Sequence, residues 1–430
     1  MKTFRAITSL LLVLCVTASV CAQTPGSGGP PVAVPLAPDY ISLESATEQL
    51  LRKNLSVEAA RLEVGVAEAE RIGARLRPRP GLTVSAENLR LSGETPASRL
   101  QEFGLSVAQP IELGNRKALR MEVAERTISV SEARLIEVLR RQLFDLKRTY
   151  YESVLSRALL GIDQENRDNF EGLLQFNKAR FEEGYIAEGD LLKVRLERIK
   201  FDFAVANAEL AFRRAKIRLL ELIGEADFER AGKLDVISRL QMPTVSLDLA
   251  ELRAAALINR PEVKVAQAEV ALAESAIKLE HSRARGEVTP YVGFKRVGVD
   301  NTVLAGVTVP LPFGNRNQSG IARAEAEQKV AETNLQFVRH RALAEVEAAF
   351  RAYETAREQV RAYETGLLRQ ADESREIQLA AYQEGAAELI TLIEAQKTRT
   401  EIRANYYRAI FDYYSSIFQL ELATGTDIKL

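Results

Sequence analysis

The sequence predicts a mainly α-helical protein built from a duplicated unit, with one β-hairpin inserted between the helices of each copy. Three observations predict this fold class: long proline-free stretches with helical periodicity, two short stretches of alternating apolar and polar residues, and the return of the same motifs about 200 residues later. The chain has 430 residues and a formal net charge of -1. It therefore lacks the basic surplus that is typical of nucleic-acid binding.

The duplication is clearest where the predicted hairpins end. The segment 104–110, Gly-Leu-Ser-Val-Ala-Gln-Pro, is followed by Gly-Asn-Arg at 114–116, and it returns as Gly-Val-Thr-Val-Pro-Leu-Pro at 306–312, followed by Gly-Asn-Arg at 314–316. Each copy is far longer than a solenoid module, so function must belong to the assembled pair. We expect the first repeat over residues 41–242 and the second over residues 243–430.

The N-terminus has the features of an export signal. Residues 1–22 combine a basic start at Lys2 and Arg5 with an apolar stretch and a small-residue cleavage site ending at Ala22, so we expect a signal peptide. A lipoprotein signal with a modified Cys21 is the second interpretation, and lipidation of the mature N-terminus stays open. Residues 23–40 are rich in proline and glycine and predict an extended leader. Both cysteines precede Gln23, so the expected mature chain has no thiolate ligand.

Proline is absent between Pro110 and Pro243 and again after Pro312. Proline costs about 3 kcal/mol inside a helix, so these spans permit very long helices. The first would have roughly 70 residues and a length on the order of 100 Å. On the helices alone, a soluble coiled-coil spacer is the simpler hypothesis. We expect helices over 115–183 and 188–224 in the first repeat, and over 315–384 and 388–425 in the second.

Two hairpins, over residues 81–109 and 290–310, interrupt the helical pattern. Apolar and polar residues alternate in both, with turns expected at 92–96 and at Asp300-Asn301, which predicts a sheet with one apolar face. The strands are long enough to cross a membrane. Lipid cannot satisfy open sheet edges, and the smallest bacterial barrels have eight strands, so four strands require an oligomer of two copies or three. Soluble hairpins packed on the helices are the alternative.

The order of these elements resembles the TolC family of outer-membrane efflux proteins over residues 41–430. The hairpin exits at 110–114 and 312–314 are the most specific features, and the segment 109–116 is similar to the heavy-metal branch, the CzcC-like and CusC-like proteins. The resemblance implies a homotrimer with a twelve-stranded β-barrel in outer-membrane lipid and an α-helical tunnel across the periplasm. It also implies docking to a periplasmic adaptor protein and an inner-membrane RND-type pump, with metal cations as the cargo. Drug efflux, type I protein secretion and an exported structural coiled-coil protein remain alternatives.

The resemblance also implies a gate at the helix tips. The family pattern places an Asp and a Tyr in contact there, and the matching positions are Asp190 and Tyr382. Acidic positions at the pore mouth correspond to Thr391, which departs from the pattern, and Glu394, which keeps it. The alternative interpretation is an Asp that favours a helix start beside a packing Tyr, with Glu394 as a single exposed carboxylate.

The two expected tips are apolar for loops, which indicates a surface for a partner. We expect adaptor contacts there, although Ala387 stands where some relatives place an arginine in the closing network. The tip residues are Gly184, Tyr185, Ile186, Ala187, Gly385, Ala386 and Ala387.

We find no candidate catalytic residues, cofactor motif or metal-ligand set. His281 and His340 are the only histidines, and neither has a suitable partner at a useful spacing. No phosphate-binding loop or nucleophile elbow is present, so we expect a passive duct that is driven by another component.

Overall fold

The computed structural model describes residues 39–89, 94, 96, 99, 101–237, 240–311 and 313–429. All of them belong to one unit, Pro38–Leu430. The expected signal peptide, nearly all of the expected leader and part of the turn at 92–96 lie outside the described residues.

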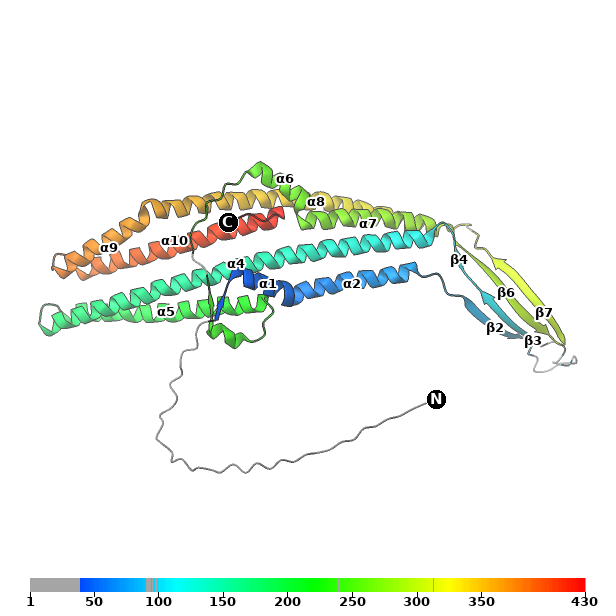
Figure 1. The fold of residues 1–430 in the computed structure, drawn as a ribbon, viewed down its shortest axis with the longest axis horizontal. Helices are drawn as coiled ribbons and strands as arrows, with labels where there is room; N and C mark the ends of the chain where they lie inside the picture. Colours follow the sequence, from blue (N-terminus) through cyan, green and yellow to red (C-terminus); the bar gives the residue numbers. More distant parts are fainter. Residues whose placement is uncertain are drawn as a thin grey trace, which may run out of the picture. The chain divides into compact units, whose positions relative to one another are not determined.

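The two repeats contain matching series of helices and strands (Figure 1). The first consists of α1 (Leu43–Lys53), α2 (Leu55–Arg75), β2 (Gly81–Glu87), β3 (Glu102–Ala108), β4 (Ile111–Glu112), α4 (Arg116–Glu182) and α5 (Glu188–Leu222). The second consists of α6 (Leu249–Asn259), α7 (Pro261–Arg283), β6 (Glu287–Val297), β7 (Asp300–Thr308), α8 (Gln318–Ala362), a π-helical turn (Tyr363–Leu367), α9 (Leu368–Gln383) and α10 (Leu389–Thr424). A short parallel pair, β1 (Asp39–Ile41) and β5 (Leu234–Val236), and the 3-10 helix η1 (Phe228–Gly232) complete the fold.

The long helices run side by side, with the strands at the end opposite the α4–α5 and α9–α10 tips (Figure 1). Helix α4 has 67 residues, which corresponds to a length of about 100 Å. It packs against α5, α2, α7 and α10, and thereby joins the two repeats. The length of the rods follows from the proline-free sequence, because nothing interrupts the backbone hydrogen-bond ladder.

The duplication is visible in how helices meet end to end. Helix α5 ends at Gly224 against the α1–α2 junction, where the Asn54 amide donates a hydrogen bond to the Leu222 carbonyl at 2.8 Å. A Cβ on Gly224 would lie 2.3 Å from the Lys53 carbonyl oxygen. Helix α10 ends in the same way at Gly425, where a Cβ would lie 2.6 Å from a carbonyl oxygen at the α6–α7 junction. Both glycines have positive φ, of 72° and 71°, so each copy needs glycine for both conformation and space.

Four tyrosines fix the connection between the repeats to the main core. The tyrosine hydroxyls donate to carbonyl groups of this connection, within its described residues 237 and 240–248. A buried tyrosine is favourable when its hydroxyl finds such a partner. The bonds run from Tyr150 to Ile237 (2.9 Å), Tyr353 to Val245 (2.7 Å), Tyr413 to Pro243 (3.0 Å) and Tyr414 to Gln241 (2.8 Å).

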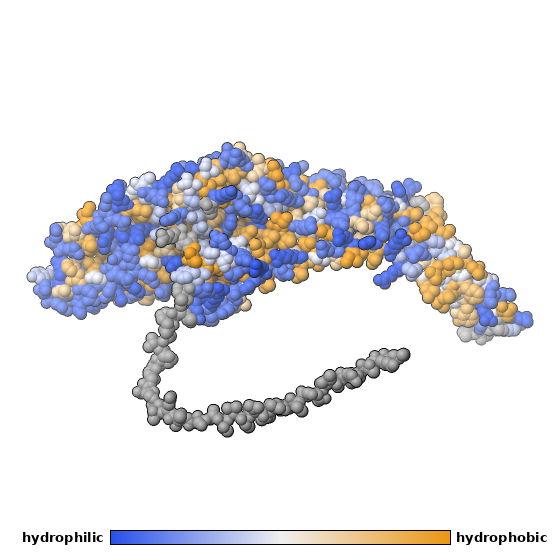
Figure 2. Space-filling model, viewed as in Figure 1, coloured by the Kyte–Doolittle hydropathy of each residue, from blue (hydrophilic) through white to orange (hydrophobic). Residues whose placement is uncertain are grey.

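The four main strands form an antiparallel sheet in the order β2-β3-β6-β7. Its register places Val84 opposite Leu105, Leu105 opposite Phe294, and Phe294 opposite Val303, which gives an apolar row across one face. This face is exposed: Val84 is 74% and Val303 77% exposed. Hydrophobic residues gather over the strands in Figure 2. The described residues contain no helix long and apolar enough to span a membrane.

The opposite face of the sheet is polar. Its central row runs through Ser85, Gly104, Lys295 and Thr302. Lys295 forms ion pairs with Glu102 and with Glu87, the latter at 3.8 Å. The sheet therefore separates an apolar from a polar surface.

Three details differ from the sequence expectation. The helix expected over 315–384 begins at Gln318, because Asn317 takes the left-handed cap conformation (φ 60°) that Asn115 takes (φ 59°) before α4. The same helix is interrupted by the π-helical turn Tyr363–Leu367. The second hairpin turns at Gly298-Val299 rather than at Asp300-Asn301, since the positive φ of Gly298 (58°) suits a two-residue turn.

Candidate functional site at the helix tips

Both helix tips are closed by the same backbone turn. In the first tip, the Gly184 N–H donates to the Phe181 carbonyl (3.0 Å) and the Tyr185 N–H to the Arg180 carbonyl (2.8 Å). In the second, the Gly385 and Ala386 N–H groups donate to the Tyr382 (3.1 Å) and Ala381 (2.8 Å) carbonyls. This pair of bonds is the Schellman motif, and both glycines have the left-handed conformation it requires, with φ of 79°.

Most of the tip residues that the sequence analysis named are exposed to solvent. Tyr185 is 72% exposed, Gly184, Ala187, Gly385 and Ala386 are exposed, and Ile186 and Ala387 are half-buried. The tips therefore offer a small, partly apolar surface at one end of the helices.

A small hydrophobic cluster behind the tips joins four helices. Its buried members lie on α4, α5, α9 and α10, so both repeats contribute to it. Tyr382 from α9 lies in this cluster and is 5% exposed. The buried members are Phe170, Val194, Tyr382, Leu389, Leu392 and Ile393.

The Tyr382 hydroxyl is bound by α4 of the other repeat. It donates to Asn177 Oδ1, and the Asn177 amide donates in turn to the Leu173 carbonyl at 2.8 Å. The guanidinium of Arg180 lies 5.6 Å from the centre of the Tyr382 ring. Burial raises the pKa of Tyr382 and outweighs the opposing effect of the Asn177 hydrogen bond, so the hydroxyl stays a donor. This contact joins α9 to α4.

Within the single chain, the Tyr382 hydroxyl donates to Asn177 and not to Asp190, so the expected bond between Asp190 and Tyr382 stays a prediction for the assembled tips. Asp190 lies in the first turn of α5 and forms an ion pair with Lys193 at 3.0 Å. Asn177 takes the Tyr382 hydroxyl instead. A carboxylate in the first turn of a helix is favourable in itself.

Thr391 and Glu394 lie in the first two turns of α10. The Thr391 hydroxyl donates to the Glu388 carbonyl at 2.7 Å, a local bond at the start of the helix. Glu394 is exposed. Neither side chain takes part in the contact between Tyr382 and Asn177.

A second polar contact between the repeats lies further from the tips. The Gln396 amide donates to Asn166 Oδ1 at 2.8 Å, and both side chains are almost fully buried. Beside them, Glu165 forms ion pairs with Arg399 (3.1 Å) and Arg403 (2.8 Å). Burial acts to raise the pKa of Glu165, but the hydrogen bonds from the two arginines outweigh it and lower the pKa below its ordinary value.

The sequence analysis did not identify these polar residues, although the sequence carries a signal for them. Asn166, Phe170, Leu173 and Asn177 follow one another at spacings of four, three and four, which are core positions of a coiled coil. Asparagine at such a position usually finds a specific partner, because an unpaired buried amide is costly.

Among the described residues, no group of three or more His, Cys, Asp or Glu side chains is placed to hold a metal ion. His281 lies at the end of α7 and His340 on α8.

Long helical hairpins with matched tips, joined to an antiparallel sheet with an apolar face, form the same fold as solved outer-membrane channels. The chain belongs to the outer membrane efflux protein family, whose model matches residues 46–225 and 252–426. It is an outer-membrane channel component of an efflux system, and its family is one of transport ducts rather than enzymes.

Similar proteins include two curated relatives from Cupriavidus metallidurans. The chain is 24% identical over 415 residues to the cobalt-zinc-cadmium resistance protein CzcC, with 95% of each chain covered. It is 26% identical over 316 residues to the nickel and cobalt resistance protein CnrC, covering 71% of this chain and 73% of the relative. The crystal structure of CusC has the same fold, with a TM-score of 0.74 at 18% identity over 89% of this chain and 92% of that one.

Proposed function

We propose that three copies of this chain form the exit duct of a tripartite efflux system that carries metal cations. A periplasmic adaptor protein binds the helix tips, and an inner-membrane RND-type pump supplies the energy. The observation that carries the proposal is the sheet, which exposes an apolar face and ends in two outer strands, β2 and β7.

The sheet supports assembly because lipid cannot satisfy the backbone groups of open strand edges. Within the described residues, β2 pairs with β3 alone and β7 with β6 alone. Neighbouring strands in the sheet are antiparallel throughout, so β7 of one copy would also be antiparallel to β2 of the next. Three copies would close a barrel of about twelve strands, within the range of bacterial outer-membrane barrels.

An exposed apolar seam on α5 supports association between copies. Its members recur at spacings of three, four or seven residues, which is the pattern of a coiled-coil contact. Phe203 is 67% and Leu196 52% exposed in the single chain. A second copy is the occupant that the repeated spacing favours, because another long helix with a matching repeat is what covers a coiled-coil seam. The seam consists of Leu192, Leu196, Ile199, Phe203, Leu210 and Ile217.

The names of the relatives support metal cations as cargo. Both curated relatives described above are named for resistance to cobalt, and between them for zinc, cadmium and nickel. A strain lacking this chain should become sensitive to these cations and regain resistance with the wild-type gene. Sensitivity to drugs alone, or loss of a secreted protein alone, would identify one of the other two cargo classes.

The seam offers a matched test of assembly. Phe203→Glu places a charge in the seam and should yield monomers that do not restore resistance. Ala211→Glu, on an exposed position of the same helix outside the seam, should remain trimeric and active. A trimeric, active Phe203→Glu variant would remove the seam from the interface.

The helix tips are the proposed site of adaptor contact and of a gate. The exposed turns at 184–187 and 385–387 suit partner binding, since they are short, matched and partly apolar. The bond between Tyr382 and Asn177 would hold α9 against α4 in the closed state. Three copies of Glu394 around one axis would attract cations to the pore mouth.

A further inference from the structure

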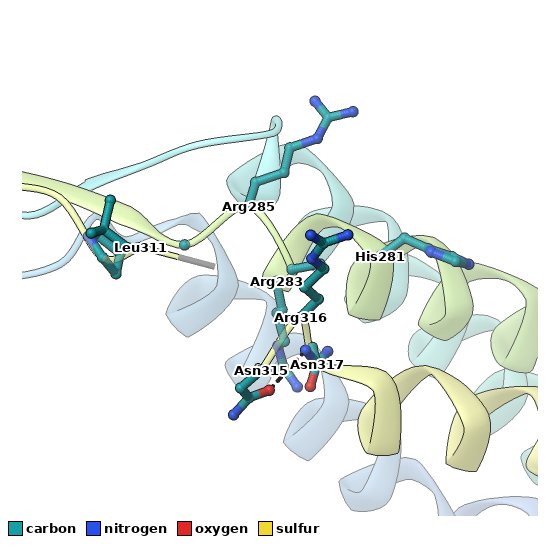
Figure 3. Close-up of a pocket in the computed structure, with 10 residues that line it drawn as sticks. His281, Arg283, Arg285, Leu311, Asn315, Arg316 and Asn317 are labelled. Carbon is teal, nitrogen blue, oxygen red and sulfur yellow. Dashed lines mark hydrogen bonds between the residues drawn. The ribbon is translucent and has the colours of Figure 1, made fainter. Parts of the chain in front are cut away.

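Each repeat has a basic pocket where its helices meet the sheet. The pocket of the second repeat has a volume of about 710 Å³ and lies between the end of α7 and the turn before α8. In Figure 3, Arg283 at the end of α7 lies beside Asn315, Arg316 and Asn317 of the turn, whereas the side chains of His281 and Arg285 point away from this group.

The corresponding pocket of the first repeat has a volume of about 490 Å³. It lies between the segment that follows α2 and the start of α4, and Arg77, Arg116 and Lys117 line it. The sequence Arg-Pro-Arg at 77–79 follows α2 as Arg-Ala-Arg at 283–285 ends α7. The duplication has therefore kept two arginines at the same place in each copy.

The charges in these pockets are only partly neutralised. The pocket at α7 has three arginines, one histidine and no carboxylate among its lining residues. Arg283 forms an ion pair with Glu280, whereas Arg285 has no ion pair among the described residues. In the other pocket, Glu112 is bound by Arg120, which itself lies outside the lining.

The first-repeat pocket keeps its own unpaired cations. Its Arg116 is bound by Glu287, whereas Arg77 and Lys117 form no ion pair with any described residue. Each pocket therefore has a net positive charge facing solvent.

Exposed apolar side chains adjoin the same pockets. Leu311 lines the pocket at α7 and is 68% exposed, and Phe313, two residues further along the chain, is 82% exposed. Ile111 lines the other pocket and is 49% exposed. Basic residues beside apolar ones, at the end of strands with an apolar face, are the pattern of a membrane–water interface.

We propose that the two basic pockets bind the phosphate headgroups of anionic phospholipids in the periplasmic leaflet of the outer membrane. The inference rests on the outer-membrane location of the family and goes beyond the duct function. Arginine suits this ligand because its guanidinium binds phosphate through two parallel hydrogen bonds. The exposed Leu311 and Ile111 favour a lipid over free phosphate, since only a lipid brings acyl chains to cover them.

The test is native mass spectrometry of the purified full chain, with bound lipid counted per chain so that the result does not depend on the oligomeric state. Dioleoyl-phosphatidylglycerol is titrated against dioleoyl-phosphatidylcholine, and glycerol 3-phosphate serves as the free phosphate. The wild type should prefer phosphatidylglycerol. Arg283→Gln with Arg285→Gln should weaken phosphatidylglycerol binding at that pocket about 25-fold, since each basic side chain near the membrane contributes about fivefold.

Arg77→Gln with Lys117→Gln should weaken the second binding event to a similar extent. The matched control is Arg323→Gln with Arg369→Gln, which changes the net charge equally on exposed helical positions and should leave binding unchanged. Arg283→Lys with Arg285→Lys should retain most of the preference, because the charge remains.

Three results would overturn the proposal. The first is unchanged phosphatidylglycerol binding by the glutamine variants. The second is an equal loss in the control, which would indicate attraction by net charge alone. The third is glycerol 3-phosphate binding as tightly as phosphatidylglycerol, which would show a site for free anions. A metal-sensitive phenotype in the deletion strain would stand in every case, so failure here is distinct from failure of the duct function.

Discussion

Replacement of Tyr382 by phenylalanine removes one hydroxyl from the contact between the two repeats at the tips. Tyr382 is 5% exposed and Asn177 is fully buried, so no solvent takes the place of the lost donor. The ring and its packing in the tip cluster remain. The variant therefore tests the hydrogen bond rather than the hydrophobic contact.

The size of the effect follows from the burial of Asn177. Its Oδ1 atom accepts a hydrogen bond from Tyr382 and from no other described residue. A buried acceptor left without a donor costs about 1–3 kcal/mol. If the bond exists in the closed tip alone, Tyr382→Phe shifts the equilibrium towards the open tip roughly 5- to 150-fold.

The assay is single-channel conductance in planar lipid bilayers, measured without adaptor or pump. Tyr382→Phe should increase the open probability or the mean conductance. Tyr185→Phe is the matched control, because it removes a hydroxyl from a tyrosine that is 72% exposed at the same tip, and it should have no effect. Asn177→Leu combined with Tyr382→Phe should restore part of the closed population, since both polar partners are then replaced by apolar groups.

Asp190→Asn distinguishes this account from the one based on family pattern alone. Asp190 is paired with Lys193, so its substitution should leave conductance near the wild-type value. An effect of Asp190→Asn as large as that of Tyr382→Phe, or an unchanged Tyr382→Phe channel, would refute the reasoning.

Three further predictions concern stability and docking. Gly224→Ala should lower the unfolding temperature, because its Cβ would lie 2.3 Å from a carbonyl oxygen and its φ is 72°. Gly172→Ala, in open space within α4, should raise the unfolding temperature, because alanine stabilises a helix by about 0.5–1 kcal/mol relative to glycine. Equal shifts in the two variants would contradict the end-to-end contact. The pKa of Glu165 is lowered from its ordinary value of 4.5, so its carboxylate stabilises the fold above about pH 4.5 and loses this effect as the pH falls further. The difference in unfolding temperature between wild type and Glu165→Gln should therefore shrink between about pH 7 and about pH 3. A constant difference would contradict a stabilising role of the Glu165 carboxylate. Gly184→Trp combined with Ala387→Asp should abolish cross-linking to the adaptor and metal resistance while the channel still assembles, and normal export with the adaptor bound would exclude the tips as the docking surface.

The long helices and strands follow from local properties of the sequence. Helix α4 ends at Glu182 because Gly184 closes it, and it runs uninterrupted from Arg116 because no proline intervenes. The sequence does not predict the π-helical turn Tyr363–Leu367, since one additional residue in a helical turn leaves no distinct compositional pattern. Whether Gly298 or Asp300 begins a turn depends on the pairing register of β6 with β7, which is a tertiary property.

The candidate site was predictable in location but not in its contacts. The glycine breaks identify the tips, and the structure forms the same turn at both. The contact of Tyr382 with Asn177 was missed because the family pattern concerns Asp190, and both residues lie in the other repeat, far from Tyr382 in sequence. Such a pairing depends on how the two repeats pack, and sequence spacing alone does not reveal it.

Cross-linking between β2 and β7 of different copies tests the central claim most directly. Both cysteines of the sequence, Cys15 and Cys21, fall in the expected signal peptide, so cysteines introduced at Ser85 and Thr302 on the outer strands would be the reactive ones. A short bismaleimide should convert the double variant in outer-membrane fractions to covalent trimers, and leave each single variant monomeric on denaturing gels. A double variant that yields only monomers, or a chain recovered in the soluble fraction, would contradict a shared barrel and the duct built on it.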